Sequence, residues 1–182
     1  MNFVGRTYEL EYLNRLYAQM GSSFCVVYGR RRIGKTRLLT HWLETKSALG
    51  FYWVATDTSA TALLRSFSQT LYRQLHGVPP ADPGFTYYDW DEAFRVLARC
   101  AQQSPPKLVV ILDEFTYALK YGWLTIEEVC AALQARPTMQ HVVITGRGAP
   151  EALIAIADTV SEINLVKHAY KTGVQAMPGI EW

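Results

Sequence analysis

The segment Gly29–Thr36, with the sequence GRRRIGKT, is the feature that most constrains the fold of this chain. It matches the pattern G-x-x-x-x-G-K-[ST], follows the apolar run 24–28 and precedes helical periodicity over about 35–46. Glycines at both ends of the loop allow backbone amides to turn toward phosphate oxygens, and the following helix directs its positive end at the same anion. The sequence therefore predicts a phosphate-binding loop between a buried strand and a helix.

The side chains of this loop suit a nucleoside triphosphate with Mg²⁺. Lys35 is expected to reach the β- and γ-phosphates, and the Thr36 hydroxyl is expected to bind Mg²⁺. The three consecutive arginines can neutralise triphosphate charge or can simply lie in solvent, and the sequence leaves both readings open. We expect ATP to contact the whole loop, namely Gly29, Arg30, Arg31, Arg32, Ile33, Gly34, Lys35 and Thr36.

An acidic pair, Asp113 and Glu114, follows the apolar run 108–112. In an open parallel sheet, ligands bind beyond the carboxyl ends of the strands, so this pair is expected to face the phosphate loop. We expect Asp113 to hold Mg²⁺, usually through water, and Glu114 to orient or deprotonate a water that attacks the γ-phosphate. Acidic residues at this place can also cap the next helix, but the upstream loop favours the metal and base roles.

Two further candidates follow the apolar run 141–144. Thr145 ends that predicted strand and is expected to contact the γ-phosphate or the attacking water, although threonine is also an ordinary strand residue. Arg147 lies between two glycines and is expected to reach the nucleotide crevice. Together, Glu114 and Thr145 form the predicted catalytic pair.

Apolar runs alternate with helical patterns along the chain. Strands are expected at 24–28, 51–55, 108–112, 141–144 and 160–163, and helices at about 7–20, 35–46, 60–75, 89–103, 125–135 and 150–157. The tail 173–182 is expected to be an irregular covering segment. Because there is no internal repeat and no linker, the sequence predicts one α/β domain over 1–182 with a mainly parallel sheet.

Composition excludes several other classes of protein. The chain has 182 residues and is 49% hydrophobic and 13% aromatic, which supplies enough apolar surface for a folded core. A net charge of +2 is too balanced to indicate a nucleic-acid or membrane surface. No apolar run reaches the roughly 18 residues of a membrane span, and the start lacks a signal-peptide pattern, so a cytoplasmic protein is expected. The 3 cysteines and 4 histidines show no metal-ligand spacing.

The first part of the chain, about residues 3–115, resembles the archaeal-type P-loop ATPases, which are related to the AAA+ and STAND groups. The resemblance rests on FVGR at 3–6 with Glu9-Leu10, on VVYGRRRIGKT at 26–36 and on ILDEF at 111–115. It implies a RecA-like three-layer sandwich with sheet order 5-1-4-3-2 and Mg-dependent ATP binding and hydrolysis. It also implies that Gly29, Gly34, Lys35 and Thr36 hold phosphate and Mg²⁺, that Asp113 holds the metal, and that Glu114 is the base.

The second part, about residues 109–182, is similar to the ATP:corrinoid adenosyltransferases. The similarity rests on DEFTYALKYG at 113–122, ARP at 135–137, ITGRGAP at 144–150, and the shorter matches 157–158, 166–168 and 173–182. That family transfers the adenosyl group of ATP to Co(I) of a corrinoid and releases triphosphate. The resemblance therefore implies a corrinoid as a second substrate.

The two resemblances meet near 107–116, where both families carry a strand that ends in acidic residues. We interpret the chain as a recombination, natural or engineered, of two related P-loop halves. The favoured function is a Mg-ATP-binding domain with slow or absent hydrolysis. Corrinoid adenosyl transfer is the first alternative, and a fold scaffold with incidental phosphate binding is the second. The sequence leaves the oligomeric state open.

Overall fold

Five parallel strands form one sheet in the computed structural model, which describes residues 5–46, 49–56, 59–103 and 107–164. The strand order is β2-β3-β4-β1-β5, and every neighbouring pair is parallel. Read from the other edge, this is the predicted order 5-1-4-3-2. The strands are β1 (Phe24–Gly29), β2 (Leu49–Val54), β3 (Leu108–Asp113), β4 (Gln140–Gly146) and β5 (Thr159–Ile163). The predicted tail segment 173–182 lies outside the described residues.

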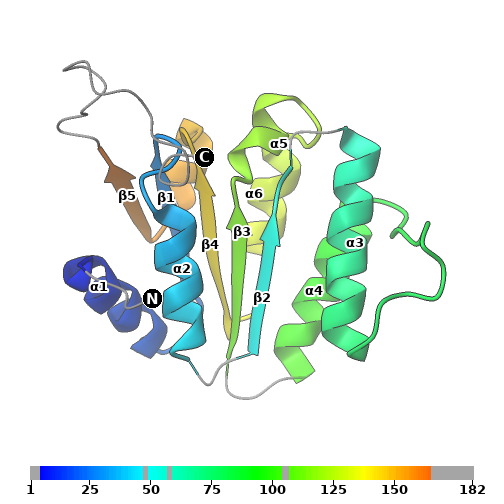
Figure 1. Cartoon of the computed structure of the whole chain (residues 1–182), viewed down its shortest axis with the longest axis horizontal. Helices are drawn as coiled ribbons and strands as arrows, with labels where there is room; N and C mark the ends of the chain where they lie inside the picture. The colour runs from blue at the N-terminus through cyan, green and yellow to red at the C-terminus, as the bar shows by residue number, and fades with distance from the viewer. Residues whose placement is uncertain (1–4, 47–48, 57–58, 104–106, 165–182) are drawn as a thin grey trace, which may run out of the picture.

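Helices cover both faces of this sheet, as Figure 1 shows. One face is covered by α1 (Thr7–Ala18) and α2 (Lys35–Glu44). The other face is covered by α3 (Ala60–His76), α4 (Trp90–Gln103), α5 (Thr116–Lys120), α6 (Ile126–Gln134) and α7 (Glu151–Ile156). The predicted three-layer α/β sandwich is thereby confirmed. None of the described helices combines the length and the apolarity needed to cross a bilayer.

The inner strand β3, which lies between β2 and β4, shows why the strands are continuous apolar runs. All of its residues are buried. Val109 and Ile111 face the layer of α1 and α2, whereas Val110 and Leu112 face the opposite helices. A strand that is covered on both faces needs apolar side chains in both directions, so its sequence lacks the polar alternation of a half-exposed strand.

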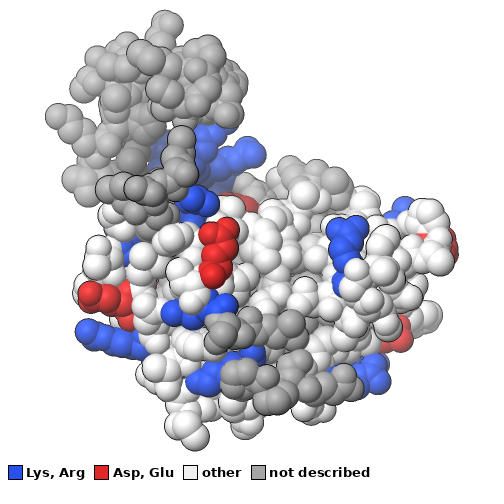
Figure 2. Space-filling model, turned by 60° about the horizontal axis from the view of Figure 1, so that its bottom comes forward, with Lys and Arg blue, Asp and Glu red and all other residues white. Residues whose placement is uncertain are grey.

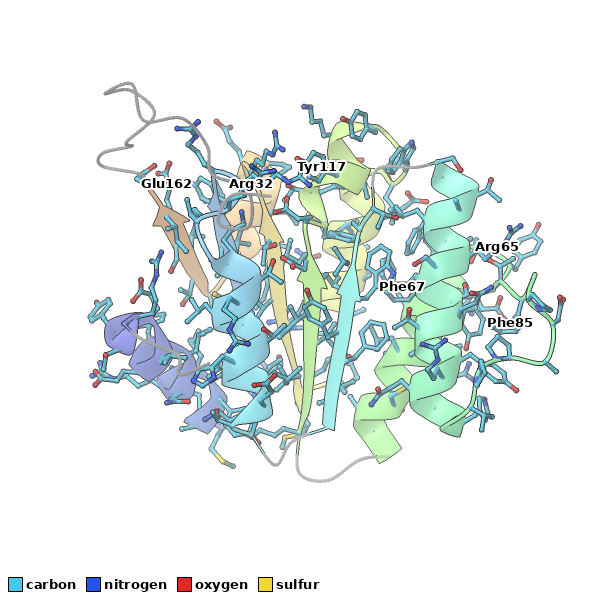
Figure 3. The ribbon with its side chains drawn as sticks, viewed as in Figure 1. Arg32, Arg65, Phe67, Phe85, Tyr117 and Glu162 are labelled. Atoms are coloured by element: carbon cyan, nitrogen blue, oxygen red, sulfur yellow. The ribbon has the colours of Figure 1, made fainter. Side chains whose placement is uncertain are left out.

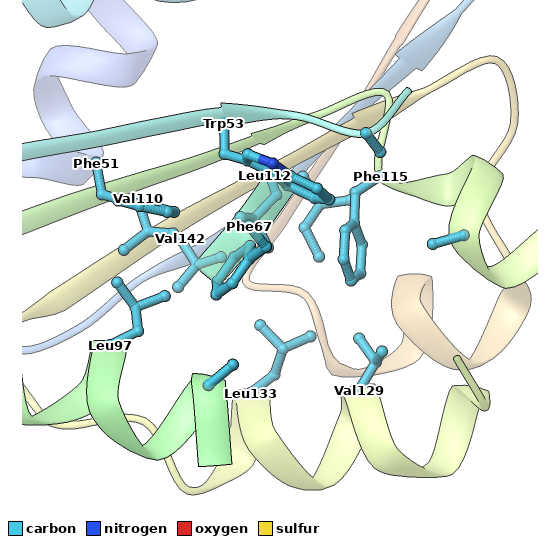
Figure 4. Packing of buried hydrophobic residues seen from close by; sticks show 14 of the residues in the cluster. Phe51, Trp53, Phe67, Leu97, Val110, Leu112, Phe115, Val129, Leu133 and Val142 are labelled. Atoms are coloured by element: carbon cyan, nitrogen blue, oxygen red, sulfur yellow. The ribbon is translucent and has the colours of Figure 1, made fainter. Parts of the chain in front are cut away.

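The larger of the two cores gathers around Phe67 of α3, which is fully buried (Figure 4). Its ring centroid lies 5.4 Å from that of Phe51, 5.1 Å from that of Trp53 and 5.3 Å from that of Trp90, each in an edge-on arrangement. Such pairs contribute about 0.5–1.5 kcal/mol beyond the burial of their area. This core holds α3 and α4 against β2, and α1 and α2 cover the opposite face of the sheet.

The short helix α5 has no counterpart among the predicted elements. It spans 5 residues, too few for an apolar periodicity to show in the sequence. Two residues separate it from the end of β3, and it packs close to the end of β4. There Gly146 leaves room for the Thr116 hydroxyl, because a Cβ atom at residue 146 would overlap it. This contact fixes the start of α5 beside the carboxyl end of β4.

Candidate nucleotide site

The predicted phosphate loop lies where β1 ends and α2 begins, at the edge of the sheet where the strands end (Figure 1). Gly34 precedes α2 with a φ of 86°, and Arg32 has a φ of 66°. Both values lie in the left-handed region, which glycine adopts without a steric penalty and arginine adopts only with strain. The loop is therefore held in a curled form by its surroundings. Strain of this kind is frequent where a backbone is shaped to receive a ligand.

Lys35 is the buried cation of the site, with 3% of its surface exposed. Its Nζ atom donates to the carbonyl oxygens of Gly29 and Arg30, at 3.0 Å each, and lies 3.3 Å from Oε1 of Glu114. An ammonium group has three donors, and here two go to the loop itself and the third faces the acidic pair. The lysine thus closes the loop and connects it to the end of β3.

Asp113 accepts hydrogen bonds from three described side chains that come from three different elements. Thr36 of α2 donates to Oδ2 at 2.6 Å, Tyr52 of β2 donates to the same oxygen at 2.9 Å, and Thr145 of β4 donates to Oδ1 at 2.5 Å. The carboxylate is 1% exposed. The structure therefore brings together the predicted metal residues Thr36 and Asp113, although the assignment of a metal to them stays a prediction.

The donor set of this cluster fits Mg²⁺, which prefers carboxylate and hydroxyl oxygens. Thr36 gives its one hydroxyl proton to Asp113, so only oxygen lone pairs remain for a further partner. The Oε2 atom of Glu114 is buried and has no hydrogen-bond partner among the residues that the structure describes. A carboxylate oxygen of this kind has lone pairs for a cation or a water beside it.

Thr145 connects the turn after β3 to the end of β4. Its hydroxyl donates to Asp113 and accepts from the backbone N–H of Glu114 at 2.8 Å. Glu114 itself has a φ of 54°, which is uncommon for a residue with a side chain. The predicted contact between Thr145 and phosphate or water would need the hydroxyl to give up its bond to Asp113. That contact stays a prediction.

The arginines lie on the surface around the loop. Arg30, Arg31 and Arg32 are exposed, and only the backbone of Arg30 contacts Lys35 in the bonds given above. Arg147 is exposed as well, and its guanidinium lies 5.6 Å from the ring centroid of Tyr117. Figure 3 shows Arg32 and Tyr117 at the same end of the molecule. The contacts to nucleotide that the sequence predicts for Arg30, Arg31, Arg32 and Arg147 remain predictions.

Two site residues were not predicted from the sequence. Tyr52 lies in an apolar run that indicates a strand and nothing more. Its burial, and then the negative charge of Asp113, raise the pKa of its hydroxyl above the usual 10. Arg6 donates from Nη2 to the carbonyl of Ile33 in the loop at 3.0 Å and from Nη1 to Glu9 at 2.6 Å. Arg6 belongs to the FVGR motif on which the resemblance to ATPases rests, and this motif is the sequence feature from which a role of Arg6 at the site could have been predicted.

Figure 2 shows lysine, arginine and acidic side chains dispersed among uncharged residues on the face that is drawn. This distribution agrees with the net charge of +2.

Solved structures confirm the class of fold. The chain resembles the ORC2 protein of Aeropyrum pernix in its ADPNP-ADP complexes, with a TM-score of 0.61 and 20% identity, over 89% of this chain and 48% of that one. At this identity the similarity concerns the fold alone. It agrees with the resemblance of the first part of the chain to AAA+-related ATPases. A short stretch of 44 residues, 24% of the chain, is also 46% identical to 75% of "Uncharacterized ATP-binding protein MJ0423" of Methanocaldococcus jannaschii.

The sequence comparisons identify the family. The family model of the "ATP:corrinoid adenosyltransferase BtuR/CobO/CobP" matches residues 55–182. The "Corrinoid adenosyltransferase" of Pseudomonas aeruginosa is 38% identical over 155 residues, 80% of this chain and 73% of that protein. The "Corrinoid adenosyltransferase CobA" of Salmonella typhimurium is 46% identical over 93 residues, 51% of this chain and 45% of that protein.

These matches change the order of the two functions that the sequence analysis considers first. They support the alternative, corrinoid adenosyl transfer, better than the favoured hypothesis of ATP binding with slow or absent hydrolysis. The family match begins at residue 55, after the phosphate loop, but it includes Asp113, Glu114 and Thr145. The chain belongs to the ATP:corrinoid adenosyltransferase family and has the fold of a P-loop nucleotide-binding protein.

Proposed function

We propose that the chain binds Mg-ATP at the loop Gly29–Thr36 and transfers the adenosyl group to the Co(I) atom of a corrinoid. One observation carries this proposal. The Thr36 hydroxyl of the loop lies 2.6 Å from the Asp113 carboxylate of the family-matched segment. A phosphate loop and an acidic strand end that meet in this way make a site for a triphosphate with its metal.

The transfer step requires little proton chemistry from the protein. Co(I) attacks the ribose 5′ carbon of ATP, a cobalt–carbon bond forms, and the bond from that carbon to oxygen breaks. The electron pair of that bond leaves with the triphosphate, so no proton has to be removed. In this proposal, Lys35 and the loop amides stabilise the charge of the departing triphosphate, and Mg²⁺ would supply further neutralisation when bound. Thr36 and Asp113 would hold this metal.

A second candidate function is Mg-ATP binding with slow hydrolysis or none. The observation that favours it is Glu114, which lies beside Lys35 and would serve as a base for water attack. Fast hydrolysis also needs an arginine that contacts the transferred phosphoryl group, which contributes roughly 10³–10⁵ in rate. The exposed Arg147, which packs on the ring of Tyr117, is the candidate within the described chain.

We also propose that the chain is one domain in which two P-loop halves are joined near 107–116. In support, this segment contains β3, which pairs with β2 of the first half and with β4 of the second. The apolar residues of β3 suit a strand that is covered by helices on both faces. The natural or engineered origin of such a junction makes no difference to the chemistry proposed here.

The experiment that tests the proposed function mixes the chain with Mg-ATP and chemically reduced cobalamin. We expect adenosylcobalamin, detected by its visible spectrum, together with inorganic triphosphate. The control variant Lys46→Ala removes a cation just beyond the other end of α2 and should retain the activity, whereas Lys35→Ala should lose it. Release of ADP and phosphate without adenosylcobalamin would favour the second candidate, and no reaction with wild-type protein would contradict transfer.

A further inference from the structure

The carboxylate of Asp113, the predicted metal residue, accepts hydrogen bonds from three described side chains. An ionised carboxylate has about four lone-pair positions on its two oxygens. Thr36 and Tyr52 occupy two positions on Oδ2, and Thr145 occupies one on Oδ1. Among the described side chains, this leaves one lone pair of Oδ1 without a donor. The direction of that remaining lone pair depends on the three donors that fix the carboxylate.

Tyr52 is the donor that neither a motif nor the family match explains. It precedes the matched residues 55–182 and lies 61 residues away from Asp113 in the sequence. The parallel register of β2 and β3 brings it there, since Tyr52 pairs with Ile111 and Val54 pairs with Asp113. A phenylalanine would fill the same strand position and the same packing. What the hydroxyl adds to the ring is therefore its hydrogen bond to the Asp113 carboxylate.

We propose that Tyr52 is a positioning residue for the metal site, whose hydroxyl holds Asp113 in the orientation that presents one oxygen lone pair to a Mg²⁺-bound water. The inference rests on the proposed function, because it concerns the metal of the bound nucleotide. Thr36 reaches Asp113 from the helix after the loop, and Tyr52 reaches the same oxygen from the neighbouring strand. The Tyr52 hydrogen bond would keep the Asp113 carboxylate in one orientation when the Thr36 hydroxyl oxygen also binds the metal.

Outer partners of this kind are important in metal sites, because they orient the residues that contact the metal. Their removal weakens metal binding by about 10–100-fold in known cases. Among the described residues, the Tyr52 hydroxyl donates to Asp113 and makes no hydrogen bond to the loop carbonyls that Lys35 holds, so its removal should leave metal-free nucleotide binding unchanged. Loss of the Tyr52 hydroxyl should therefore weaken nucleotide binding in the presence of Mg²⁺ and leave it unchanged in its absence.

The test compares wild type with Tyr52→Phe and with the control Tyr12→Phe. Tyr12 is a suitable control because its hydroxyl also makes a 2.9 Å hydrogen bond, to Thr159, away from the loop. The dissociation constant of a non-hydrolysable ATP analogue is measured by calorimetry with saturating Mg²⁺ and again with EDTA. The dissociation constant with EDTA divided by the one with Mg²⁺ reports how much the metal strengthens binding. Thermal melts without nucleotide verify that each variant folds.

We expect Tyr52→Phe to lower this ratio by about tenfold while the EDTA value stays that of wild type. Tyr12→Phe should retain the full ratio. An unchanged ratio in Tyr52→Phe overturns the inference while leaving the proposed function intact, and so does an equal loss with and without Mg²⁺. A wild-type chain that binds no nucleotide in either condition overturns the proposed function, and this inference with it.

Discussion

The Nζ atom of Lys35 lies 3.3 Å from Oε1 of Glu114, so the cation of the phosphate loop is paired with the acidic residue that follows β3. Both side chains are largely withdrawn from solvent, with 3% and 20% of their surfaces exposed. A triphosphate in the loop would compete with Glu114 for this ammonium. The pair therefore connects nucleotide binding to the orientation of Glu114.

The first prediction concerns Glu114→Gln. Loss of its negative charge should strengthen ATP binding by about fivefold, since a partly buried ion pair of about 1 kcal/mol no longer holds Lys35 back. Any ATP hydrolysis should be lost, because the amide cannot act as a base. Adenosyl transfer should persist, because it needs no proton removal. Calorimetry and the cobalamin assay measure these effects, with the exposed Glu44→Gln as control. A parallel loss of hydrolysis and transfer would contradict the assigned roles.

The second prediction concerns Arg6, which connects α1 to the loop through the carbonyl of Ile33. Arg6→Ala should weaken Mg-ATP binding by about tenfold, from about 1.5 kcal/mol for a hydrogen bond with a charged donor. Arg6→Lys should rescue it poorly, because one ammonium cannot replace two guanidinium nitrogens that bond to Ile33 and Glu9. The exposed Arg15→Ala on the same helix is the control. Equal affinities in Arg6→Ala and Arg15→Ala would show that this contact has no influence on the loop.

The third prediction is a loss of stability in mild acid that originates at His141. This side chain is 2% exposed, its Nδ1 contacts the Ser23 hydroxyl at 2.7 Å, and its Nε2 has no partner within the described ranges. Burial, and then the charges of Lys107 and Arg136, lower the pKa of His141 from 6.5 to about 4. Below pH 6.5 the unfolded chain binds a proton that the folded chain does not, so stability falls as the pH decreases toward 4.

The size of this effect is about 1.4 kcal/mol per pH unit within that window. Urea unfolding at pH 7.5 and pH 5 should therefore show a difference of about 2 kcal/mol attributable to His141. His141→Gln should remove this part of the pH dependence, whereas His76→Gln, at an exposed histidine, should retain it. If the two variants have the same pH dependence of stability, His141 is not the group that causes the loss of stability in mild acid.

The fourth prediction uses the close approach of α5 and β4. Gly146→Ala should lower the free energy of unfolding by about 1–3 kcal/mol, because the new methyl group would overlap the Thr116 hydroxyl. Gly148→Ala should be nearly neutral, since a Cβ atom there has no heavy atom within 4 Å. Denaturant unfolding of the two variants measures the difference. Equal stability in the two variants would show that α5 moves away without a penalty.

The sequence predicts the fold well where a pattern is local. Each buried strand is an apolar run and the loop is a contiguous motif, so the order of elements and the parallel sheet follow directly. The positions of Asp113 and Thr145 also follow, because both end a strand and parallel strands end at the same edge. Limits of elements are harder to predict. β2 covers Leu49–Val54 rather than 51–55, since pairing with β3 decides its ends.

The rest of the site depends on contacts between residues far apart in the chain. Tyr52 reaches Asp113 across 61 residues, and Arg6 reaches Ile33 across 27. Neither spacing is a pattern that one sequence reveals, because the register of two strands and the docking of α1 determine these contacts. The contact between Lys35 and Glu114 could not be predicted from the sequence either. Both residues were expected at the site, but their direct contact was not.

The most direct test of the account is calorimetric titration of Mg-ATP into wild type, Lys35→Ala and Lys46→Ala. If the curled loop and the buried ammonium hold the triphosphate, Lys35→Ala should bind at least about 100-fold more weakly, as expected when the buried charge pair between Lys35 and the triphosphate, of roughly 3 kcal/mol, is lost. Lys46→Ala should bind like wild type. The same affinity in all three proteins would contradict the placement of ATP in this loop.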